Sequence, residues 1–425
     1  MKLIKYPPET EWPVLQERPE IDVTTLFGTV QAVLDKVRCE GDAAVRYYGN
    51  LFDKVDIDDF EVNKEEIREA ESVLTEELKS AIRVALSNIE KFHAAQATPE
   101  LIIETMPGIT CWQKAVPIDK IGLYIPGGTA PLFSTVLMLA IPARIAGCRE
   151  IILCTPPNRE GKIHPAILYA AQIAGVHKIF KVGGSQAIAA MSYGTENIPK
   201  VYKIFGPGNQ YVTAAKQLVS LKDVAIDMPA GPSEVEIIAD EAANPVFIAS
   251  DFLSQAEHGA DSQSVLLTDS EPLAEAVVQE IERQLSRLPR KEFAEKSLAN
   301  SRVIILKNRN EIIRFTNQYA PEHLIIHTSD YRKIKDEIRN AGSVFLGAYT
   351  PESAGDYASG TNHTLPTKGY AKMYSGVNLD SFIKKITFQE ITRDGLGTLG
   401  PAIEILAENE QLDAHKNAVT VRVVS

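Results

Sequence analysis

The sequence predicts an α/β protein with two Rossmann-like, doubly wound domains whose sheets are parallel. A short apolar strand, a glycine turn and a helix repeat four times in about a hundred residues from Lys120. A second series of alternating strands and helices occupies residues 235–346. Because parallel strands need crossover connections, this alternation is typical of sheets covered by helices.

Helices are expected ahead of the first sheet, from residue 24 to about residue 95. Aliphatic side chains recur there at near-helical spacing: Val33, Val37, Val45, Ile67, Val73, Leu78, Ile82, Leu86 and Ile89. Gly41 and the acidic stretch 56–59 mark breaks between successive helices.

The first repeated series predicts a nucleotide-binding domain. Its strands are expected at residues 121–125, 150–154, 178–182 and 200–205, and its helices at 134–146, 165–174, from Ser185 and after Asn209. Glycines follow three strands, at 127–128, 183–184 and 206–208. Glycine lets a ligand approach the backbone and a helix N-terminus attracts phosphate, but tight βα turns alone also favour glycine. Without a GxGxxG motif, the three turns indicate a nucleotide only weakly.

The second series predicts another α/β domain. Its strands are expected at residues 235–238, 264–267, 303–306, 324–327 and 343–346, and its helices at 245–258, 272–288, 310–319 and 331–341. Two successive α/β halves predict a cleft between them, with ligands beyond the carboxyl ends of the strands. The last fifty residues are less regular, with a helix near 401–408.

These patterns divide the 425-residue chain at roughly 150 residues per domain. The expected parts are an N-terminal segment (1–20), a discontinuous first α/β domain with its N-terminal helices (21–119 and 234–375), the nucleotide-binding domain (120–233) and a C-terminal segment (376–425).

Composition restricts the possible partners and the compartment. The formal net charge of −12 disfavours nucleic acid and anionic lipid, because both need clustered lysine and arginine. Four cysteines without a CxxC pair indicate a reducing compartment. Residues 1–8 show no secretory signal, and no stretch approaches the ~20 apolar residues of a membrane span. We therefore expect a cytoplasmic protein that binds neither membranes nor nucleic acid.

Two polar segments could carry chemistry, although each also has a plain structural explanation. Gln255 and His258 share one helix face and could bind a metal ion, but His258 also suits the negative end of a helix that stops at Gly259. Glu322 and His323 could act as a general acid–base pair ahead of a strand. Adjacent glutamate and histidine are, however, common by chance.

Two later segments are still weaker signals. Asp356 and His363 belong to a polar, glycine-rich loop after the last strand, where α/β active sites occur, yet such loops are usually surface turns. Glu410 and His415 near the C-terminus read as an ordinary exposed tail.

The segments IDMPAGPSE (226–234) and DFLSQAEH (251–258) resemble the signature of the histidinol dehydrogenase family. Further elements similar to that family lie at 122–128, 206–209, 321–324, 353–357 and 414–415. Their order and spacing fit from about Asp22 to the C-terminus.

The resemblance implies a complete set of site residues. The implied zinc ligands are Gln255, His258, Asp356 and His415, a mixed nitrogen and oxygen set that suits Zn²⁺. The implied catalytic pair is Glu322 and His323. The implied substrate contacts are Ser233, Gln255, His258, His323, Asp356, Glu410 and His415, while His363 lies in a motif near them. The implied NAD contacts are Tyr124, Gln186 and Asn209.

The resemblance also implies a reaction. The family oxidises L-histidinol through L-histidinal to L-histidine with two NAD⁺ in succession, the final steps of histidine biosynthesis. His323 would accept the hydroxyl proton, Glu322 would activate the water that hydrates the aldehyde, and one zinc ion per subunit would orient the substrate. Family members are homodimers whose C-terminal segment crosses to the partner, which implies that Glu410 and His415 complete the neighbour's site.

Three alternatives stay open: a related zinc- and NAD-dependent dehydrogenase for another small alcohol, a zinc hydrolase, and a non-catalytic nucleotide-binding module. Glu410 favours histidinol, because its carboxylate could meet a charged amine or imidazole. The nucleotide-binding half argues against a hydrolase. A binding module would leave the pair Glu322 and His323 unexplained.

Overall fold

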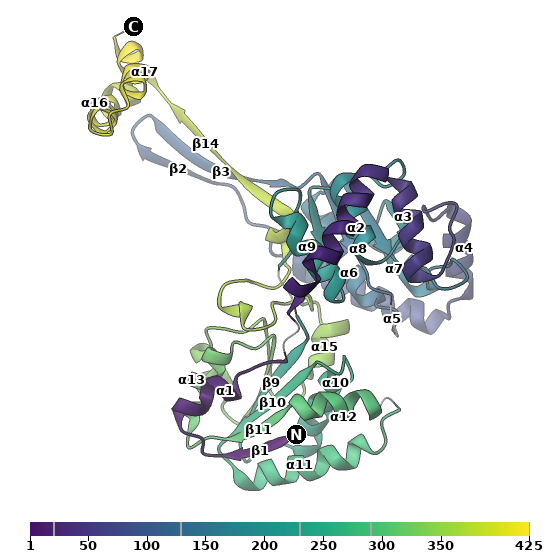
Figure 1. Ribbon diagram of the computed structural model, residues 1–425. Helices are drawn as coiled ribbons and strands as arrows, with labels where there is room; N and C mark the ends of the chain where they lie inside the picture. The colour runs from purple at the N-terminus through teal and green to yellow at the C-terminus, as the bar shows by residue number, and fades with distance from the viewer. Residues whose placement is uncertain (20–21, 128–129, 229–230, 290, 425) are drawn as a thin grey trace.

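Two parallel sheets and one antiparallel sheet organise the chain. The computed structural model describes residues 1–19, 22–127, 130–228, 231–289 and 291–424, so Gly128 and residues 229–230 of the signature segment lie outside the described residues. The parallel sheets have the strand orders β6-β5-β4-β7-β8 and β1-β11-β10-β9-β12-β13, whereas β14-β3-β2 is antiparallel (Figure 1). The expected α/β fold with two parallel sheets is confirmed.

The five-stranded sheet carries helices on both faces. Its strands are β4 (Lys120–Tyr124), β5 (Glu150–Thr155), β6 (Lys178–Lys181), β7 (Lys203–Phe205) and β8 (Ala225–Ile226). Its helices are α6 (Phe133–Ala146), α7 (Pro165–Ala174), α8 (Gly184–Tyr193) and α9 (Gln210–Ser220). Buried aliphatic side chains form one cluster with α6 and α7 and another with α8 and α9, so the sheet has a core on each face.

The N-terminal helices form an outer layer on this five-stranded part. They are α2 (Phe27–Glu40), α3 (Asp42–Tyr48), α4 (Lys64–Val73) and α5 (Glu76–Ala94). Helix α2 packs on α8 and α9, α4 packs on α7, and α5 packs on α6. The expected grouping of 21–119 with 234–375 therefore differs from the packing, because the apolar faces of these helices are buried against α6–α9. The exact domain boundaries stay a prediction.

The six-stranded sheet contains the expected second series and one additional strand. Its strands are β1 (Lys2–Lys5), β9 (Glu234–Ala239), β10 (Gln263–Thr268), β11 (Arg302–Ile305), β12 (His323–His327) and β13 (Ser343–Leu346). Its helices are α1 (Trp12–Leu15), α10 (Pro245–Ala256), α11 (Glu271–Leu285), α12 (Lys291–Asn300), α13 (Arg309–Tyr319), α14 (Tyr331–Ile334) and α15 (Glu352–Tyr357). The N-terminal segment supplies β1, which pairs in parallel with β11 at the sheet edge.

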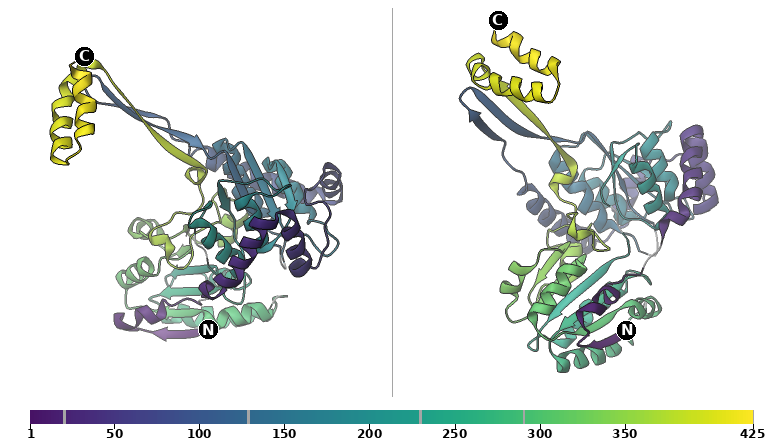
Figure 2. Two further views of the ribbon diagram at one scale, coloured as in Figure 1. Left: turned by 45° about the horizontal axis from the view of Figure 1, so that its top comes forward. Right: turned by 60° about the vertical axis from the view of Figure 1, so that its left-hand side comes forward.

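An arm extends away from both parallel-sheet parts (Figures 1 and 2). It consists of β2 (Leu101–Met106), β3 (Ile109–Pro117), β14 (Ile383–Ile391), α16 (Arg393–Asn409) and α17 (Asp413–Val423). Trp112 and Phe388 stack across β3 and β14 with ring centroids 5.3 Å apart, and α16 packs on α17.

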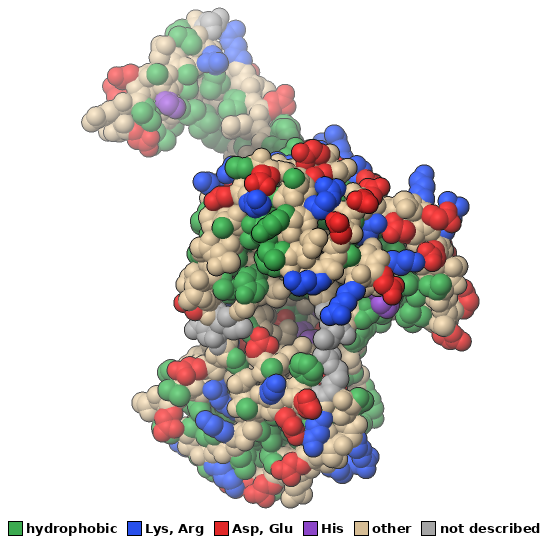
Figure 3. All heavy atoms as spheres, turned by 45° about the vertical axis from the view of Figure 1, so that its right-hand side comes forward, with side chains coloured by type: hydrophobic (Ala, Val, Ile, Leu, Met, Phe, Trp, Pro, Cys, Tyr) green, Lys and Arg blue, Asp and Glu red, His purple; other side chains and the backbone are tan. Residues whose placement is uncertain are grey.

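The arm leaves many large apolar side chains exposed (Figure 3). They include Leu101, Ile102, Ile103, Phe388, Ile405, Leu406, Leu412 and Val423. An exposed apolar surface of this kind is typical of an interface with another chain. None of the helices in the described part of the chain combines the length and the apolar character needed to cross a membrane.

Candidate active site

A cavity of about 210 Å³ lies between the two parallel-sheet parts and is lined by six of the polar residues singled out by the sequence. The five-stranded part contributes the turn 206–208 and Thr135 of α6. The six-stranded part contributes Ser233, His258, Glu322, His323, Asp356 and His363. The structure therefore brings together residues that are widely separated along the chain.

The two sheets present opposite edges to this cavity. The turn 206–208 follows the carboxyl end of β7, as expected for a parallel sheet. Ser233 and Glu322, however, immediately precede β9 and β12, and His323 is the first residue of β12. The expectation of ligands at the carboxyl ends is therefore wrong for the six-stranded sheet, whose site residues gather at the amino ends.

The main chain of Glu234 holds both members of the expected acid–base pair. Its N–H donates to Oε2 of Glu322 at 2.9 Å, and its carbonyl oxygen lies 3.2 Å from Nδ1 of His323. We infer that Nδ1 carries the proton and donates to this carbonyl, because a carbonyl can only accept. The other ring nitrogen, Nε2, has no hydrogen-bond partner among the described residues and is left as the basic atom.

Three carboxyl groups surround the buried ring of His323. Nδ1 lies 3.5 Å from Oε1 of Glu352 and 3.6 Å from Oε2 of Glu322, while Nε2 lies 3.4 Å from Oδ1 of Asp356. Burial acts to lower the pKa of His323, but the charges of these carboxylates outweigh burial and raise it well above its ordinary value. His323 therefore holds a second proton more readily than an isolated histidine.

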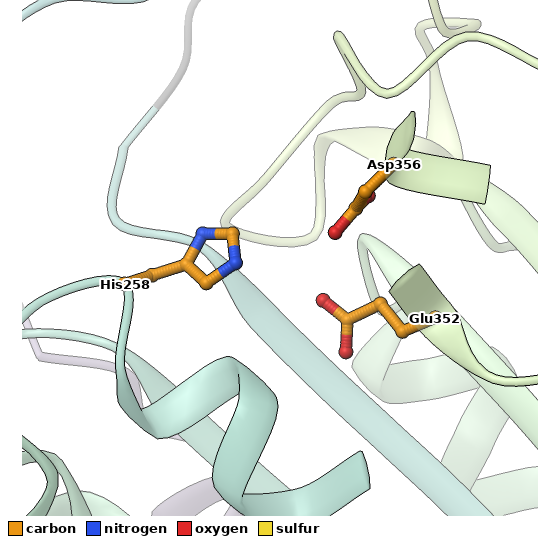
Figure 4. Close-up of side chains that lie close together, drawn as sticks. All are labelled: His258, Glu352 and Asp356. Carbon is orange, nitrogen blue, oxygen red and sulfur yellow. The ribbon is translucent and has the colours of Figure 1, made fainter. Parts of the chain in front are cut away.

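A cluster suited to a metal ion lies beside His323. Ligand atoms of His258, Glu352 and Asp356 all lie within 4.8 Å of one another, and the imidazole faces the two carboxylates (Figure 4). Glu352 is only 1% exposed, and neither of its carboxyl oxygens has a hydrogen-bond partner in the described part of the chain. Burial raises its pKa to about 8, although the neighbouring His323 opposes this shift.

Gln255 adds a further unsatisfied group. It lies on α10 three residues before His258, is 0% exposed, and both of its amide atoms lack a partner within the described residues. A buried polar group without partners is costly, and a cation would satisfy an amide or carboxyl oxygen. The nitrogen and oxygen donors present here fit zinc.

Sequence reasoning missed Glu352. Its position four residues before Asp356 was the available signal, because residues four apart share a helix face, here that of α15. No motif singled this glutamate out, and its burial is evident only in the folded chain.

His363 is held on both ring nitrogens. Nδ1 lies 2.7 Å from the carbonyl oxygen of Asp356 and Nε2 lies 3.1 Å from the hydroxyl of Thr135. Burial lowers the pKa of His363, which favours the neutral ring. We infer that His363 joins the loop after α15 to α6 across the cavity, with neither nitrogen free for a ligand.

Glu410 and His415 lie outside this cavity. Both are exposed on the arm, at the end of α16 and in α17, apart from the parallel-sheet parts of the same chain (Figure 1). The structure of one chain therefore does not bring these two residues to the other expected ligands.

Two of the expected NAD contacts meet at the carboxyl edge of the five-stranded sheet. The hydroxyl of Tyr124 accepts a hydrogen bond from the N–H of Gly184 at 3.1 Å, and Nε2 of Gln186 donates to Oδ2 of Asp53 at 3.3 Å. Burial raises the pKa of Asp53 to about 6. Asp53 also lines a cavity of about 620 Å³ with Gly127 at this edge, which is large enough for part of a nucleotide.

The glycine turns have packing reasons of their own. A Cβ added to Gly127 or Gly183 would lie 2.2 Å or 2.4 Å from side-chain atoms of Pro156. Asn209, the third expected NAD contact, is exposed and caps α9 by accepting hydrogen bonds from two main-chain N–H groups. These turns therefore do not by themselves demonstrate a nucleotide site.

A parallel sheet with a cavity at its carboxyl edge, facing a glutamate–histidine pair and a carboxylate–imidazole cluster, has the features of an enzyme active site with acid–base groups and a candidate metal site. The family model described as "Histidinol dehydrogenase" matches residues 16–423. The chain therefore belongs to the histidinol dehydrogenase family.

Individual relatives agree with this assignment. The chain is 66% identical over 423 residues to a histidinol dehydrogenase of Bacteroides thetaiotaomicron, covering 100% of this chain and 99% of the relative. It is 54% identical over 409 residues to one of Escherichia coli strain K12, covering 96% of this chain and 93% of that protein.

Solved structures show the same fold. The crystal structure of histidinol dehydrogenase from Elizabethkingia anophelis matches with a TM-score of 0.98 and 55% identity, covering 100% of this chain and 98% of that one. An acetylating aldehyde dehydrogenase from Geobacillus thermoglucosidasius matches with a TM-score of 0.50 and 16% identity, covering 89% and 94%, which is a likeness of fold alone.

The protonated state of the cluster predicts pH-dependent zinc binding. The raised pKa values of Glu352 and His323 keep protons on the cluster near neutral pH, and a cation must displace them. Zinc affinity should therefore rise from pH ~6 to pH ~8, by up to about tenfold per pH unit for each displaced proton. Calorimetry in two buffers of different ionisation enthalpy measures the proton release.

The variant Glu352→Gln provides the matched comparison, since an amide of similar shape cannot bind the titrating proton. It should release fewer protons than the wild type. Equal zinc affinity at both pH values, with no proton release, would contradict the charge assignment of the cluster.

Proposed function

We propose that this protein oxidises L-histidinol through L-histidinal to L-histidine with two NAD⁺ in succession, as the final steps of histidine biosynthesis. The observation that carries the proposal is the cavity that holds both Glu322 and His323, in a chain of this family. Within the described residues Nε2 of His323 makes no hydrogen bond, and the nearest carboxylate to it is that of Asp356, 3.4 Å away. A geometry of this kind suits proton abstraction from a hydroxyl group.

His323 is the proposed base. A cation held by the neighbouring carboxylates would offset the negative charges that raise the pKa of His323, so that the neutral ring becomes available. With its Nδ1 proton donated to the carbonyl of Glu234, Nε2 of the neutral ring can take the proton of the substrate hydroxyl in the first oxidation. The same atom can take a proton from the aldehyde hydrate in the second oxidation. The NAD⁺ molecules would accept the electrons of both steps as hydride.

Glu322 is the proposed activator of water. Its Oε2 is anchored by the N–H of Glu234, which leaves the other carboxyl oxygen for a water molecule beside the substrate carbon. A carboxylate fixed in this way can orient the water and remove its proton, so that the aldehyde becomes a hydrate that can be oxidised again.

The proposed zinc ligands are Gln255, His258 and Asp356 of one chain and His415 of a second copy. The buried amide of Gln255, which makes no hydrogen bond within the described ranges of the chain, and the close approach of His258 to Asp356 support this set. When bound, zinc would supply a positive anchor for the nitrogen atoms of the substrate. Ser233 lines the cavity and Glu410 would reach it from the second copy, both as substrate contacts.

The proposed NAD site lies at the carboxyl edge of the five-stranded sheet, with Tyr124, Gln186 and Asn209 as contacts. The cavity of about 620 Å³ beside Asp53 supports this location. Dinucleotides commonly bind at such an edge.

The proposed assembly is a cytoplasmic homodimer with shared active sites. The exposed apolar side chains of the arm support it, because a second copy would cover them. The position of His415 on the arm, outside the cavity of its own chain, supports the sharing.

The substrate and stoichiometry can be tested together. Purified protein with zinc, NAD⁺ and limiting L-histidinol should form about two NADH per substrate molecule, measured by absorbance, and chelation should abolish the reaction. No NADH from histidinol but NADH from another small alcohol would support the related dehydrogenase instead. No NADH from any alcohol would overturn the proposal.

Glu322→Gln should slow the aldehyde-to-acid step more than the alcohol oxidation. The amide keeps the shape and can still meet the N–H of Glu234, but it cannot remove a proton from water. We expect a loss of about a hundredfold or more with histidinal as substrate and a much smaller loss with histidinol, measured in single turnovers. Equal losses in both steps would contradict the assignment of water activation to Glu322. The control is Glu292→Gln, the same substitution at an exposed residue of α12.

Mixed dimers test whether the site is shared. His323→Asn damages the cavity and His415→Asn damages the arm, so a mixed dimer keeps one intact site. Random mixing should restore up to about a quarter of the wild-type activity, because about half of the dimers are mixed. Mixing His323→Asn with Asp356→Asn is the matched control and should restore none, since both changes lie in the cavity. No recovery in the first mixture would argue against sharing.

A further inference from the structure

Arg18 makes a set of buried contacts that the proposed reaction does not use directly. Its Nη2 donates to Oε1 of Glu234 at 2.8 Å and to the carbonyl oxygen of Tyr319 at 2.7 Å, and its Nε donates to Oε2 of Glu234. The guanidinium also lies over the ring of Tyr319, 3.8 Å from the centroid. The Glu234 side chain is 2% exposed and that of Arg18 15%, so solvent screens these contacts little.

The two partners of Arg18 support the acid–base pair from two directions. Glu234 holds Glu322 and His323 through its own N–H and carbonyl groups. Tyr319 ends α13, and the chain then passes through Ala320, at φ +54°, to Pro321 and the pair. A positive φ is uncommon for a residue with a side chain, and such backbone persists only where its surroundings hold it.

Arg18 joins these two segments through one planar group, beside a longer hydrogen bond of 3.5 Å from the hydroxyl of Tyr319 to Oε2 of Glu234. Its two hydrogen bonds to the Glu234 carboxylate fix the first residue of β9. Its third hydrogen bond fixes the carbonyl of Tyr319, the residue before Ala320 with its positive φ. Lysine could supply the charge and three donors, but all three would lie on one nitrogen and could not form the planar fork on the Glu234 carboxylate. Arginine at this position therefore gives the geometry as well as the charge.

Stability alone does not explain this ion pair. Removing two charges from water costs free energy that their attraction often only offsets, and apolar residues of similar volume can be as stable. A directed ion pair instead determines the orientation of the groups attached to it. Here the attached groups are Glu234, whose N–H and carbonyl contact Glu322 and His323, and the carbonyl of Tyr319, which precedes Glu322 in the chain.

We propose that Arg18 is a positioning residue for Glu322 and His323, an inference that rests on the proposed function. The N-terminal segment, anchored at the sheet edge by β1, reaches from that edge to the back of the active site and sets the orientation of the pair through Glu234 and Tyr319.

The test compares Arg18→Met, Arg18→Lys and the double variant Arg18→Met/Glu234→Gln in the zinc-loaded, full-length enzyme. Arg18→Met should lower kcat for histidinol about a hundredfold while the KM changes less than about threefold. Arg18→Lys should recover about tenfold of that loss. The double variant leaves no unpaired buried charge, so its thermal midpoint should recover while its kcat stays low.

Arg309→Met is the matched control. Arg309 is a partly exposed arginine of the same six-stranded part that bonds to the carboxylates of Asp330 and Glu337, and none of its hydrogen bonds among the described residues reaches Glu234 or Tyr319. It should lower the thermal midpoint and leave kcat within about twofold of the wild type. A kcat that follows the thermal midpoint across all four variants would show a purely structural role and overturn the inference.

A second readout does not depend on turnover. In protein with isotope-labelled histidine, the Nδ1 resonance of His323, assigned by its loss in His323→Asn, reports the hydrogen bond to Glu234. It should shift in Arg18→Met and in the double variant but not in Arg309→Met. An unchanged resonance in Arg18→Met would overturn the inference, whereas wild-type protein that forms no NADH from histidinol would overturn the proposed function alone.

Discussion

The geometry of the candidate active site depends on the main-chain N–H and carbonyl groups of Glu234. The N–H of this residue donates to Glu322, which immediately precedes the neighbouring strand β12, and its carbonyl oxygen contacts His323, the first residue of that strand. The parallel register of β9 and β12, in which His323 lies opposite Val235, makes both contacts possible. The acid–base geometry is therefore a consequence of strand pairing, which is among the most rigid features of a fold.

The arrangement of the two sheets accounts for the chemistry between them. The five-stranded sheet presents its carboxyl edge, with the turn 206–208, and the six-stranded sheet presents the amino ends of β9 and β12. In one sheet, helix N-termini and glycine turns face the cavity, which suits an anionic ligand. In the other, carboxyl groups face it, which suits a cation and a protonated imidazole. The cavity thus has two chemically different walls.

Much of the fold could be predicted from the sequence because its signal is local. Strands such as β5 and β10 are continuous buried apolar runs, and α7 has the bounds expected from its pattern. The strand β1 and the antiparallel strands β2, β3 and β14 were missed, because most of their side chains are exposed or only partly buried, and β1 is only four residues long. The position of α2–α5 on the five-stranded part was also missed, because an apolar pattern shows which helix face is buried but not which element it packs against.

The candidate site could be predicted only in part. Motif resemblance supplied His258, Glu322, His323 and Asp356, and the structure places all four in one cavity. Glu352 and Arg18 carry no motif, because their importance comes from burial and from partners far away in sequence. Long-range contacts of this kind arise from the tertiary fold and produce no periodic pattern in the amino-acid sequence.

The arm that carries His415 away from the cavity has a consequence for how the protein responds to its own abundance. If a second copy completes each site, the working unit exists only in proportion to the associated fraction of the chains. At low concentration, catalytic output would then rise with the square of the concentration of chains. Newly made chains would be inactive until they associate. Mass action alone would thus act as a threshold on the output of the enzyme.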